Sequence, residues 1–202
     1  MAIDQQQYGE DSLETSNHLS ALGGRAFRQG DNDQAQSFYE SALAIVRKQL
    51  GNRHRETAIL LSSLGMVNQL LDANDAALSN FQEALQIAQA VFGDQHRYLA
   101  SLHNHIGGVH QQTHKFTAAI QAYQTALEID QSILRNQPHP SLARDLNNLG
   151  SAYEQDGQYE QALSFYRQAA QMLEHLLTAR HPHVNGIKQN IQRVEDLLSK
   201  KE

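Results

Sequence analysis

Apolar and small residues recur along this chain with a period of about 42 positions. Four glycines that each follow Leu or Ile are separated by 42, 42 and 43 residues: Gly23, Gly65, Gly107 and Gly150. Ala stands twelve residues after each glycine, Tyr or Phe sixteen residues after it, and Ala again nineteen residues after it. Self-similarity at a fixed period of this length is typical of repeat architectures. We therefore predict four copies of one structural unit.

Each copy divides into two halves with helical periodicity. In the second copy Leu78, Phe81, Leu85 and Ala88 follow three-and-four spacing, which predicts an amphipathic helix. Turn-forming residues, such as those at 30–32, separate the halves. The predicted helical pairs span residues 13–29 and 33–50, 57–71 and 75–92, 98–113 and 117–135, and 141–156 and 160–178.

The recurring Gly and Ala predict where two helices cross closely, with the aromatic and Leu or Ile residues filling the space beside them. The one extra residue of the third copy falls at 134–139, in the linker to the fourth copy. An insertion in a linker leaves the helical faces in register, so the pattern resumes unchanged.

A further amphipathic helix is predicted after the fourth copy. One apolar stripe is formed by Val184, Ile187, Ile191, Val194 and Leu198. A terminal helix of this kind covers the apolar end of a repeat array. We divide the chain into a disordered polar tail (1–11), four repeats within 12–183 (about 16–57, 58–99, 100–142 and 143–184), and a capping helix with a polar tail (184–202).

The fourth copy resembles the consensus of the tetratricopeptide repeat (TPR) family. The matching residues are Asn147-Asn148-Leu149-Gly150, Tyr153, Gly157, Tyr159, Ala162-Leu163, Tyr166 and Ala169. The 42-residue period and the Leu-Gly-x-x-His linkers resemble the kinesin light chain subtype. The resemblance covers residues 13–183. It implies an all-α, right-handed superhelical solenoid of four TPR helix pairs plus a C-terminal capping helix, acting as a protein-binding adaptor or scaffold.

The resemblance also implies a concave groove lined by the first helix of each pair. The candidate peptide-binding residues are Phe27, Ser62, Met66, Asn104, His105, Gln111, Arg144, Asn147, Asn148 and Ser151. Amides both donate and accept hydrogen bonds, so we expect Asn104, Asn147 and Asn148 to meet the backbone of an extended peptide. The alternative is that these amides only form a solvent-exposed helix face and bind no ligand.

The apolar groove residues have two interpretations. Phe27 or Met66 would hold a hydrophobic side chain of the ligand. Packing between neighbouring repeats is the interpretation that we favour for both residues.

Docking of the C-terminal carboxylates of Hsp70 or Hsp90 is not expected. TPR domains with that function use basic groove residues, whereas the corresponding positions here hold Ser20, Gly24, Asn104 and His105. Without that positive charge a carboxylate would be desolvated unpaired. Arg144 alone does not complete such a site.

Composition excludes several other classes. The chain has 16 Lys and Arg against 22 Asp and Glu, a net charge of -6. The absence of a basic block argues against nucleic acid and anionic membranes as partners. No cysteine is present, which excludes disulfides and zinc–thiolate sites. The start lacks a signal-peptide pattern and apolar runs are too short to span a bilayer, so we expect a cytoplasmic protein.

We expect neither an enzyme nor a cofactor. No phosphate-binding glycine loop or nucleophile elbow is present. His54, His96, His139 and His181 repeat one linker position, and we interpret them as residues that fix the turn.

A second histidine cluster invites a metal hypothesis. It consists of His103, His105, His110 and His114. His110 and His114 lie one helical turn apart, but no Asp, Glu or Cys stands nearby to complete a site. His110 also occupies a core position of its repeat. We therefore expect no metal.

A different kind of function remains open beside peptide binding. The repeats could self-assemble into a homo-oligomer through their ends or convex face. If Ile187, Ile191 and Val194 cover their own repeat, stacking at that end is blocked; if the helix swaps to a neighbour, the protein dimerises.

Overall fold

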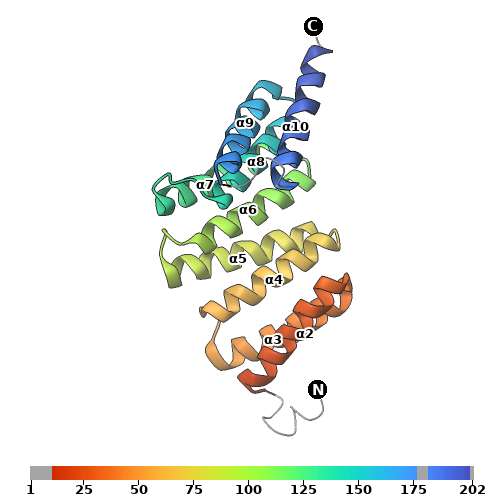
Figure 1. Ribbon diagram of the computed structural model, residues 1–202. Coiled ribbons are helices and arrows are strands. Elements are labelled where there is room, and N and C mark those ends of the chain that lie inside the picture. Colours follow the sequence, from red (N-terminus) through yellow and green to blue (C-terminus); the bar gives the residue numbers. More distant parts are fainter. Residues whose placement is uncertain (1–10, 177–181, 201–202) are drawn as a thin grey trace. The chain divides into compact units, whose positions relative to one another are not determined.

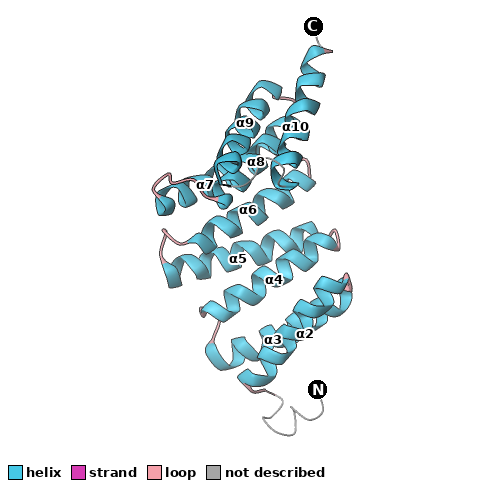
Figure 2. Ribbon diagram, in the orientation of Figure 1, coloured by secondary structure: helices cyan, strands magenta, loops and turns pink. Residues whose placement is uncertain are grey.

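The structure is a computed structural model that describes residues 11–176 and 182–200 (Figure 1). Every regular element in these ranges is an α-helix (Figure 2). The helices are α2 (Leu13–Gln29), α3 (Asn32–Leu50), α4 (Arg55–Leu70), α5 (Asn74–Phe92), α6 (Arg97–Gln112), α7 (Phe116–Leu134), α8 (Pro140–Gln155), α9 (Tyr159–Leu176) and α10 (Pro182–Ser199). The all-α class predicted from the sequence is confirmed for the described residues.

The chain forms two compact units, residues 1–94 and 95–202. In unit 1, α2 packs on α3, α3 on α4 and α4 on α5. In unit 2, α6 packs on α7, α7 on α8, α8 on α9 and α9 on α10. Packing therefore follows chain order within each unit, as expected when repeats contact only their neighbours.

The eight predicted repeat helices are confirmed, and their described ends lie within two residues of the predicted ones. Helix α2 begins where Ser12 Oγ accepts a hydrogen bond from Thr15 N at 3.1 Å. Helix α3 begins where Asp31 Oδ1 accepts from Gln34 N at 3.1 Å. Such caps satisfy N–H groups that have no partner in the first turn. Polar side chains thus cap the starts of α2 and α3, whereas α5 and α7 begin without a side-chain cap.

The linker histidines cap the first helix of three repeats. Nδ1 of His54, His96 and His139 accepts a hydrogen bond from the backbone N–H two residues later, at 3.2, 3.2 and 3.0 Å. The prediction that these residues fix the turn is confirmed for α4, α6 and α8. His181, the fourth member of the series, lies outside the described residues.

The close helix crossings predicted at the repeated glycines are confirmed. A Cβ atom on Gly65 or Gly107 would lie 2.6 Å from the ring of Phe81 or Tyr123. The aromatic ring of the second helix therefore occupies the space in which a side chain of the first helix would stand. A Cβ atom on Gly150 would likewise lie 2.7 Å from the ring of Tyr166.

The predicted capping helix is present as α10. Val184 and Val194 are fully buried, and Ile187 is almost so. Ile191 and Leu198 are partly buried against the same apolar cluster, which α7, α8 and α9 also form. The apolar stripe thus packs within its own unit. The helix begins at Pro182, two residues before the predicted start of the capping segment.

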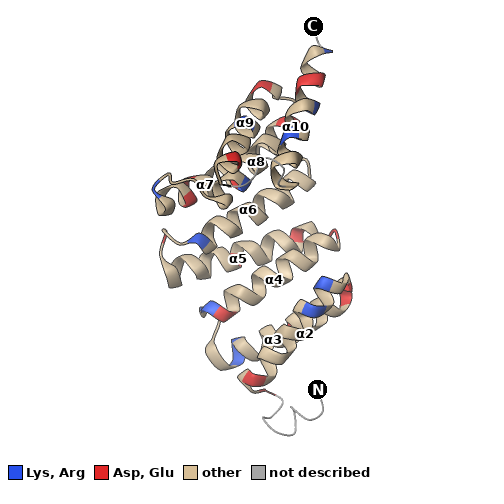
Figure 3. Cartoon of the chain, in the orientation of Figure 1, with Lys and Arg blue, Asp and Glu red and all other residues tan. Residues whose placement is uncertain are grey.

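The extra residue of the third repeat lies in the loop between α7 and α8, as predicted. Arg135 and Asn136 have φ values of 50° and 57° there, which forms the added turn. The predicted disordered tail lies outside the described residues except for Asp11, whose carboxylate pairs with Lys48. Lys or Arg residues and Asp or Glu residues are interspersed along the helices of both units (Figure 3).

Candidate functional site

The candidate residues of unit 1 lie on α2 and α4. Ser62 is buried, whereas Phe27 and Met66 are half-buried. Two further apolar residues of α4 are exposed beside them in sequence: Ile59 at 37% and Leu70 at 57%. Phe27 and Met66 thus combine packing with a partly accessible surface.

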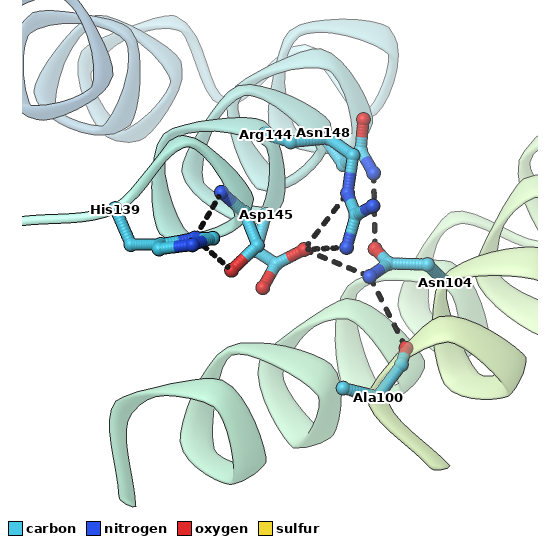
Figure 4. Close-up of polar contacts among 7 residues, drawn as sticks. Ala100, Asn104, His139, Arg144, Asp145 and Asn148 are labelled. Atoms are coloured by element: carbon cyan, nitrogen blue, oxygen red, sulfur yellow. Dashed lines mark hydrogen bonds and ion pairs between the residues drawn. The ribbon is translucent and has the colours of Figure 1, made fainter. Parts of the chain in front are cut away.

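The candidate amides of unit 2 form a network between α6 and α8 (Figure 4). Asn104 Nδ2 donates to Ala100 O at 3.1 Å and to Asp145 Oδ1 at 2.8 Å. Asn148 Nδ2 donates to Asn104 Oδ1 at 3.0 Å. Both N–H groups of the Asn104 amide are therefore used inside the protein. For Asn104 to donate a hydrogen bond to a peptide backbone, one of these internal hydrogen bonds would have to break.

Arg144 extends the network to the surface. Its Nη2 donates to Asp145 Oδ1 at 3.2 Å, while half of the Arg144 side chain stays exposed. The Asp145 side chain is fully buried, and burial raises its pKa to about 6 against the opposing effects of Asn104 and Arg144. Burial, with a contribution from Arg144, lowers the pKa of the neighbouring His105. A buried carboxylate thus holds one exposed guanidinium in place.

A second set of polar contacts links neighbouring repeats through a tyrosine. Tyr123 OH donates to Gln111 Oε1 at 2.9 Å, and Gln111 Nε2 donates to Ser151 Oγ at 2.8 Å. In the next repeat Tyr166 OH donates to Glu154 Oε2 at 2.7 Å. Burial raises the pKa of Tyr123 to about 12, which keeps this hydroxyl a donor.

Helix α10 joins these contacts. Arg193 donates to both carboxylate oxygens of Glu154, at 2.7 and 2.8 Å. Burial alone would raise the pKa of Glu154, but hydrogen bonds from Arg193 and Tyr166 bring it below its ordinary value. Asn190 Nδ2 donates to Asn147 Oδ1 at 3.3 Å. Sequence reasoning missed Asn190 and Arg193 as members of this surface because it assigned α10 a capping role alone.

A groove of about 670 Å³ opens beside this surface within unit 2. It is lined by Arg97 of α6, by His139 and residues of α8 that include Arg144 and Asn147, by Leu173 of α9, and by residues of α10 that include His183. None of the described residues that line it is Asp or Glu. Its charged and titratable lining is therefore basic, in a chain whose net charge is -6.

The second histidine cluster does not come together as a metal site. His103, His105 and His110 lie on α6, and His114 lies in the following turn with a φ of 56°. Among the described residues no group of three or more His, Cys, Asp or Glu side chains is placed to hold a metal ion. His110 was expected in the core because of its position in the repeat, but it is only half-buried. No helix in the described part of the chain is long and apolar enough to cross a membrane.

Comparison with known proteins agrees with the repeat pattern. The family model of the tetratricopeptide repeat matches residues 1–48, 26–90, 56–132 and 98–175. The curated proteins contain no significant match to the chain.

Solved structures similar to this chain include BtubC (BKLC) from P. vanneervenii, at 26% identity and a TM-score of 0.75, over 83% of this chain and 66% of that one. The chain thus spans just under two thirds of that protein. Two structures of a Podosopora anserina protein, described as a kinesin light chain with nearly identical TPR-like repeats, have TM-scores of 0.79 and 0.80. They share 17% and 16% identity with this chain, over 94% and 93% of it and 89% and 88% of their own lengths.

The repeat subtype is therefore kinesin light chain-like in period and fold. Repeats of this family serve in general as protein-interaction or scaffold modules. The chain belongs to the tetratricopeptide repeat family.

Proposed function

We propose that the chain binds an extended, carboxylate-bearing segment of a partner protein in the groove of unit 2. The observation that carries this proposal is the basic lining of the groove. Arg97 and Arg144 are both exposed there, and His139 and His183 lie beside them. Charge-assisted hydrogen bonds from guanidinium to carboxylate are about twice as strong as neutral ones, so a segment with Asp or Glu fits this lining best.

The amides beside the groove suit the backbone of such a segment. Asn147 uses its Oδ1 to accept from Asn190, which directs its Nδ2 group away from that contact. An amide N–H donor of this kind pairs with the carbonyl of any residue. Asn147 is therefore a better candidate for backbone recognition than Asn104, whose N–H groups are both used inside unit 2.

The remaining candidate residues have separate roles in the proposal. His105, Gln111, Asn148 and Ser151 belong to the polar surface of α6 and α8 and would position the groove residues. Phe27, Ser62 and Met66 lie in unit 1, and their contact with a ligand stays a prediction. Adaptor or scaffold activity and a cytoplasmic location are likewise proposals.

The test uses short fluorescein-labelled peptides and fluorescence anisotropy. A peptide of alternating Glu and Ser should bind the full chain, and its Gln analogue should bind at least about tenfold more weakly, since a charge-assisted hydrogen bond contributes about 1.5–3 kcal/mol. Added salt should weaken binding of the Glu peptide only.

Two matched variants locate the site. Arg97→Glu reverses one charge of the groove at the start of α6, where Glu is well tolerated. Arg53→Glu makes the same charge change in an exposed linker of unit 1. We expect Arg97→Glu alone to abolish binding of the Glu peptide. Equal losses in both variants, or equal affinity for the Gln peptide, would contradict recognition by this groove.

The alternative, self-assembly through the ends or convex face, has weaker support. The apolar stripe of α10 is buried in its own unit, so it presents no apolar seam to a second copy. Light scattering on the full chain tests this alternative directly, because a mass above that of one chain would favour it.

A further inference from the structure

A buried aspartate interrupts the apolar core of α8. Asp145 is 0% exposed. Counted from the repeated glycine, the equivalent position holds His18 in the first repeat and the buried Leu60 and Leu102 in the second and third. Because leucine fills this position in two repeats, helix packing does not require a carboxyl group there. Burial of a charged group costs stability unless polar partners compensate for it, so the partners of Asp145 indicate its role.

One oxygen of this carboxyl group accepts three N–H groups. Asn104 Nδ2 of α6 donates to Asp145 Oδ1 at 2.8 Å. Arg144 donates to the same oxygen through Nη2 at 3.2 Å and through Nε at 3.4 Å (Figure 4). The Asn104 amide is itself fixed, because its Oδ1 accepts from Asn148 Nδ2 at 3.0 Å. Side chains of two helices thus hold the carboxyl group in one orientation, with Oδ1 directed at the guanidinium.

These contacts use one edge of the Arg144 guanidinium and leave another edge free. The group carries five N–H donors in a rigid plane. Nε and one N–H of Nη2 are used for Asp145, and within the described part of the chain Nη1 makes no hydrogen bond. Nη1 and Nη2 each keep a donor, and two adjacent donors of this kind match the two oxygens of a carboxylate. The free edge is therefore suited to bidentate recognition.

Arg144 connects this network to the groove of unit 2. Its side chain is 51% exposed and lines the groove together with Arg97. Among the described residues Arg97 has no carboxylate partner, so the two guanidinium groups of one groove differ in how they are held. The positions equivalent to Arg144 in the first three repeats are Asn17, Ile59 and Ser101. The Arg–Asp pair therefore occurs only in the fourth repeat, beside the groove.

We propose that Asp145 is a positioning residue of the groove: it holds Arg144 by Nε and Nη2, so that the guanidinium presents its Nη1–Nη2 edge to a side-chain carboxylate of the ligand. This inference rests on the carboxylate binding proposed above. Asp145 itself does not touch the ligand. Immobilising a long side chain on binding costs affinity, and for Arg144 that cost is met when the chain folds. Asn104 acts one step further back, because it orients the carboxyl group of Asp145.

The negative charge of Asp145 by itself has the opposite effect on binding. A carboxylate beside the groove repels an acidic ligand, so its removal would strengthen binding if charge alone mattered. Asp145 Oδ1 already accepts three N–H groups, which offset this repulsion. If Asp145 positions Arg144, its removal should weaken binding, because the guanidinium becomes free to rotate out of line. The sign of the change therefore separates positioning from simple electrostatics.

The first experiment compares variants of the full chain by fluorescence anisotropy, with the peptide of alternating Glu and Ser amidated at its C-terminus. At about pH 7.5 the Asp145 carboxyl is ionised, since burial raises its pKa only to about 6. Asp145→Leu installs the residue of the second and third repeats, so the core should stay packed, which circular dichroism checks. We expect it to bind the peptide about fivefold more weakly than the wild type.

Two controls make this result specific. In an Arg144→Gln background, Asp145→Leu should cause no further weakening, because no guanidinium is left to position. Asp196→Asn removes a carboxylate from an exposed position of α10 and should leave the affinity within about twofold of the wild type. Equal or tighter binding by Asp145→Leu, or the same weakening in the Arg144→Gln background, would overturn the positioning role.

A second measurement needs neither a variant nor a ligand. In the free wild-type chain, ¹⁵N relaxation of the arginine Nε–H groups should show Arg144 ordered and Arg97 mobile. Equal mobility of the two would overturn the positioning role even if the peptide binds. An ordered Arg144 in a wild-type chain that does not bind the Glu peptide would contradict the proposed function, and the positioning of a ligand site would fail with it. The two failures are thus distinguishable.

Discussion

At the scale of single residues, the spacing of each helical pair depends on one missing Cβ atom. Gly23 and Gly24 are adjacent on α2 but differ in this respect. A Cβ on Gly23 would lie 2.9 Å from the ring of Tyr39, whereas one on Gly24 would lie no closer than 3.5 Å to the Tyr39 hydroxyl and 3.6 Å to Arg28 Nη1. The first distance is a steric clash and the second is an ordinary contact. Only the first glycine is therefore required by packing.

This difference gives an internally controlled prediction. We expect Gly23→Ala to lower the free energy of unfolding by about 1–3 kcal/mol, as overpacking in a core does. Gly24→Ala should be neutral or stabilising by up to about 1 kcal/mol, because Ala favours the helix over Gly. Urea unfolding of both variants measures the difference. Equal effects would mean that the Tyr39 ring moves aside without cost.

The sequence predicted the candidate site residues less completely than the fold. Asn104 and Asn148 were expected to face a ligand, but Asn148 donates to Asn104 and Asn104 donates to Asp145. The partners are separated by 41 and 44 residues, close to one repeat period. Polar residues about one repeat apart in the sequence are therefore the signal from which these contacts could have been predicted. Their geometry depends on the rotation of α6 against α8, which residue spacing alone does not specify.

At the scale of elements, one histidine per linker sets where a repeat begins. His54 precedes α4 and its Nδ1 accepts from Glu56 N at 3.2 Å. An N-cap of this kind satisfies one of the four free N–H groups of the first turn. The same geometry at α6 and α8 explains why the linker length varies while the histidine remains next to the helix.

The capping role is testable at His54. His54→Ala should destabilise the chain by about 0.5–2 kcal/mol because the acceptor is lost. His54→Asn restores a side-chain oxygen acceptor and should recover most of that stability. Thermal unfolding of both variants provides the comparison. If Asn performs no better than Ala, the imidazole acts by packing and not by capping.

The helices themselves were predictable because their signals are local and repeated. Helix ends agreed within two residues where three-and-four spacing met turn residues. The apolar stripe of α10 likewise predicted its packing on the end of unit 2. The polar face of α10 carried no such signal, although Asn190 and Arg193 reach α8 through it. Periodicity identifies the buried face of a helix but not the partners of its exposed face.

At the scale of the whole molecule, the fold persists at very low sequence identity. The Podosopora anserina repeats reach a TM-score of 0.80 at 16% identity. What the chains are shown to share is the fold. Recognition of a partner depends on surface side chains, which a shared fold leaves unconstrained. The basic groove of unit 2 is consequently a property of this chain's own residues.

Stability in repeat proteins is local because each repeat contacts only its neighbours. Val194 of α10 is fully buried against unit 2. Val194→Asp would place an unpaired carboxylate there, and we expect unit 2 to lose about 3–5 kcal/mol. Gln189→Asp, on the exposed face of the same helix, should change stability by no more than about 0.5 kcal/mol.

Hydrogen exchange measured by mass spectrometry shows which helices lose stability in Val194→Asp. In Val194→Asp the amides of α8, α9 and α10 should exchange faster, while those of α2 and α3 keep the wild-type rate. Faster exchange throughout the chain would mean that both units unfold together as one cooperative body. Unchanged exchange in α8 and α9 would mean that α10 is not what protects the end of unit 2, and the capping role derived from its apolar stripe would be wrong.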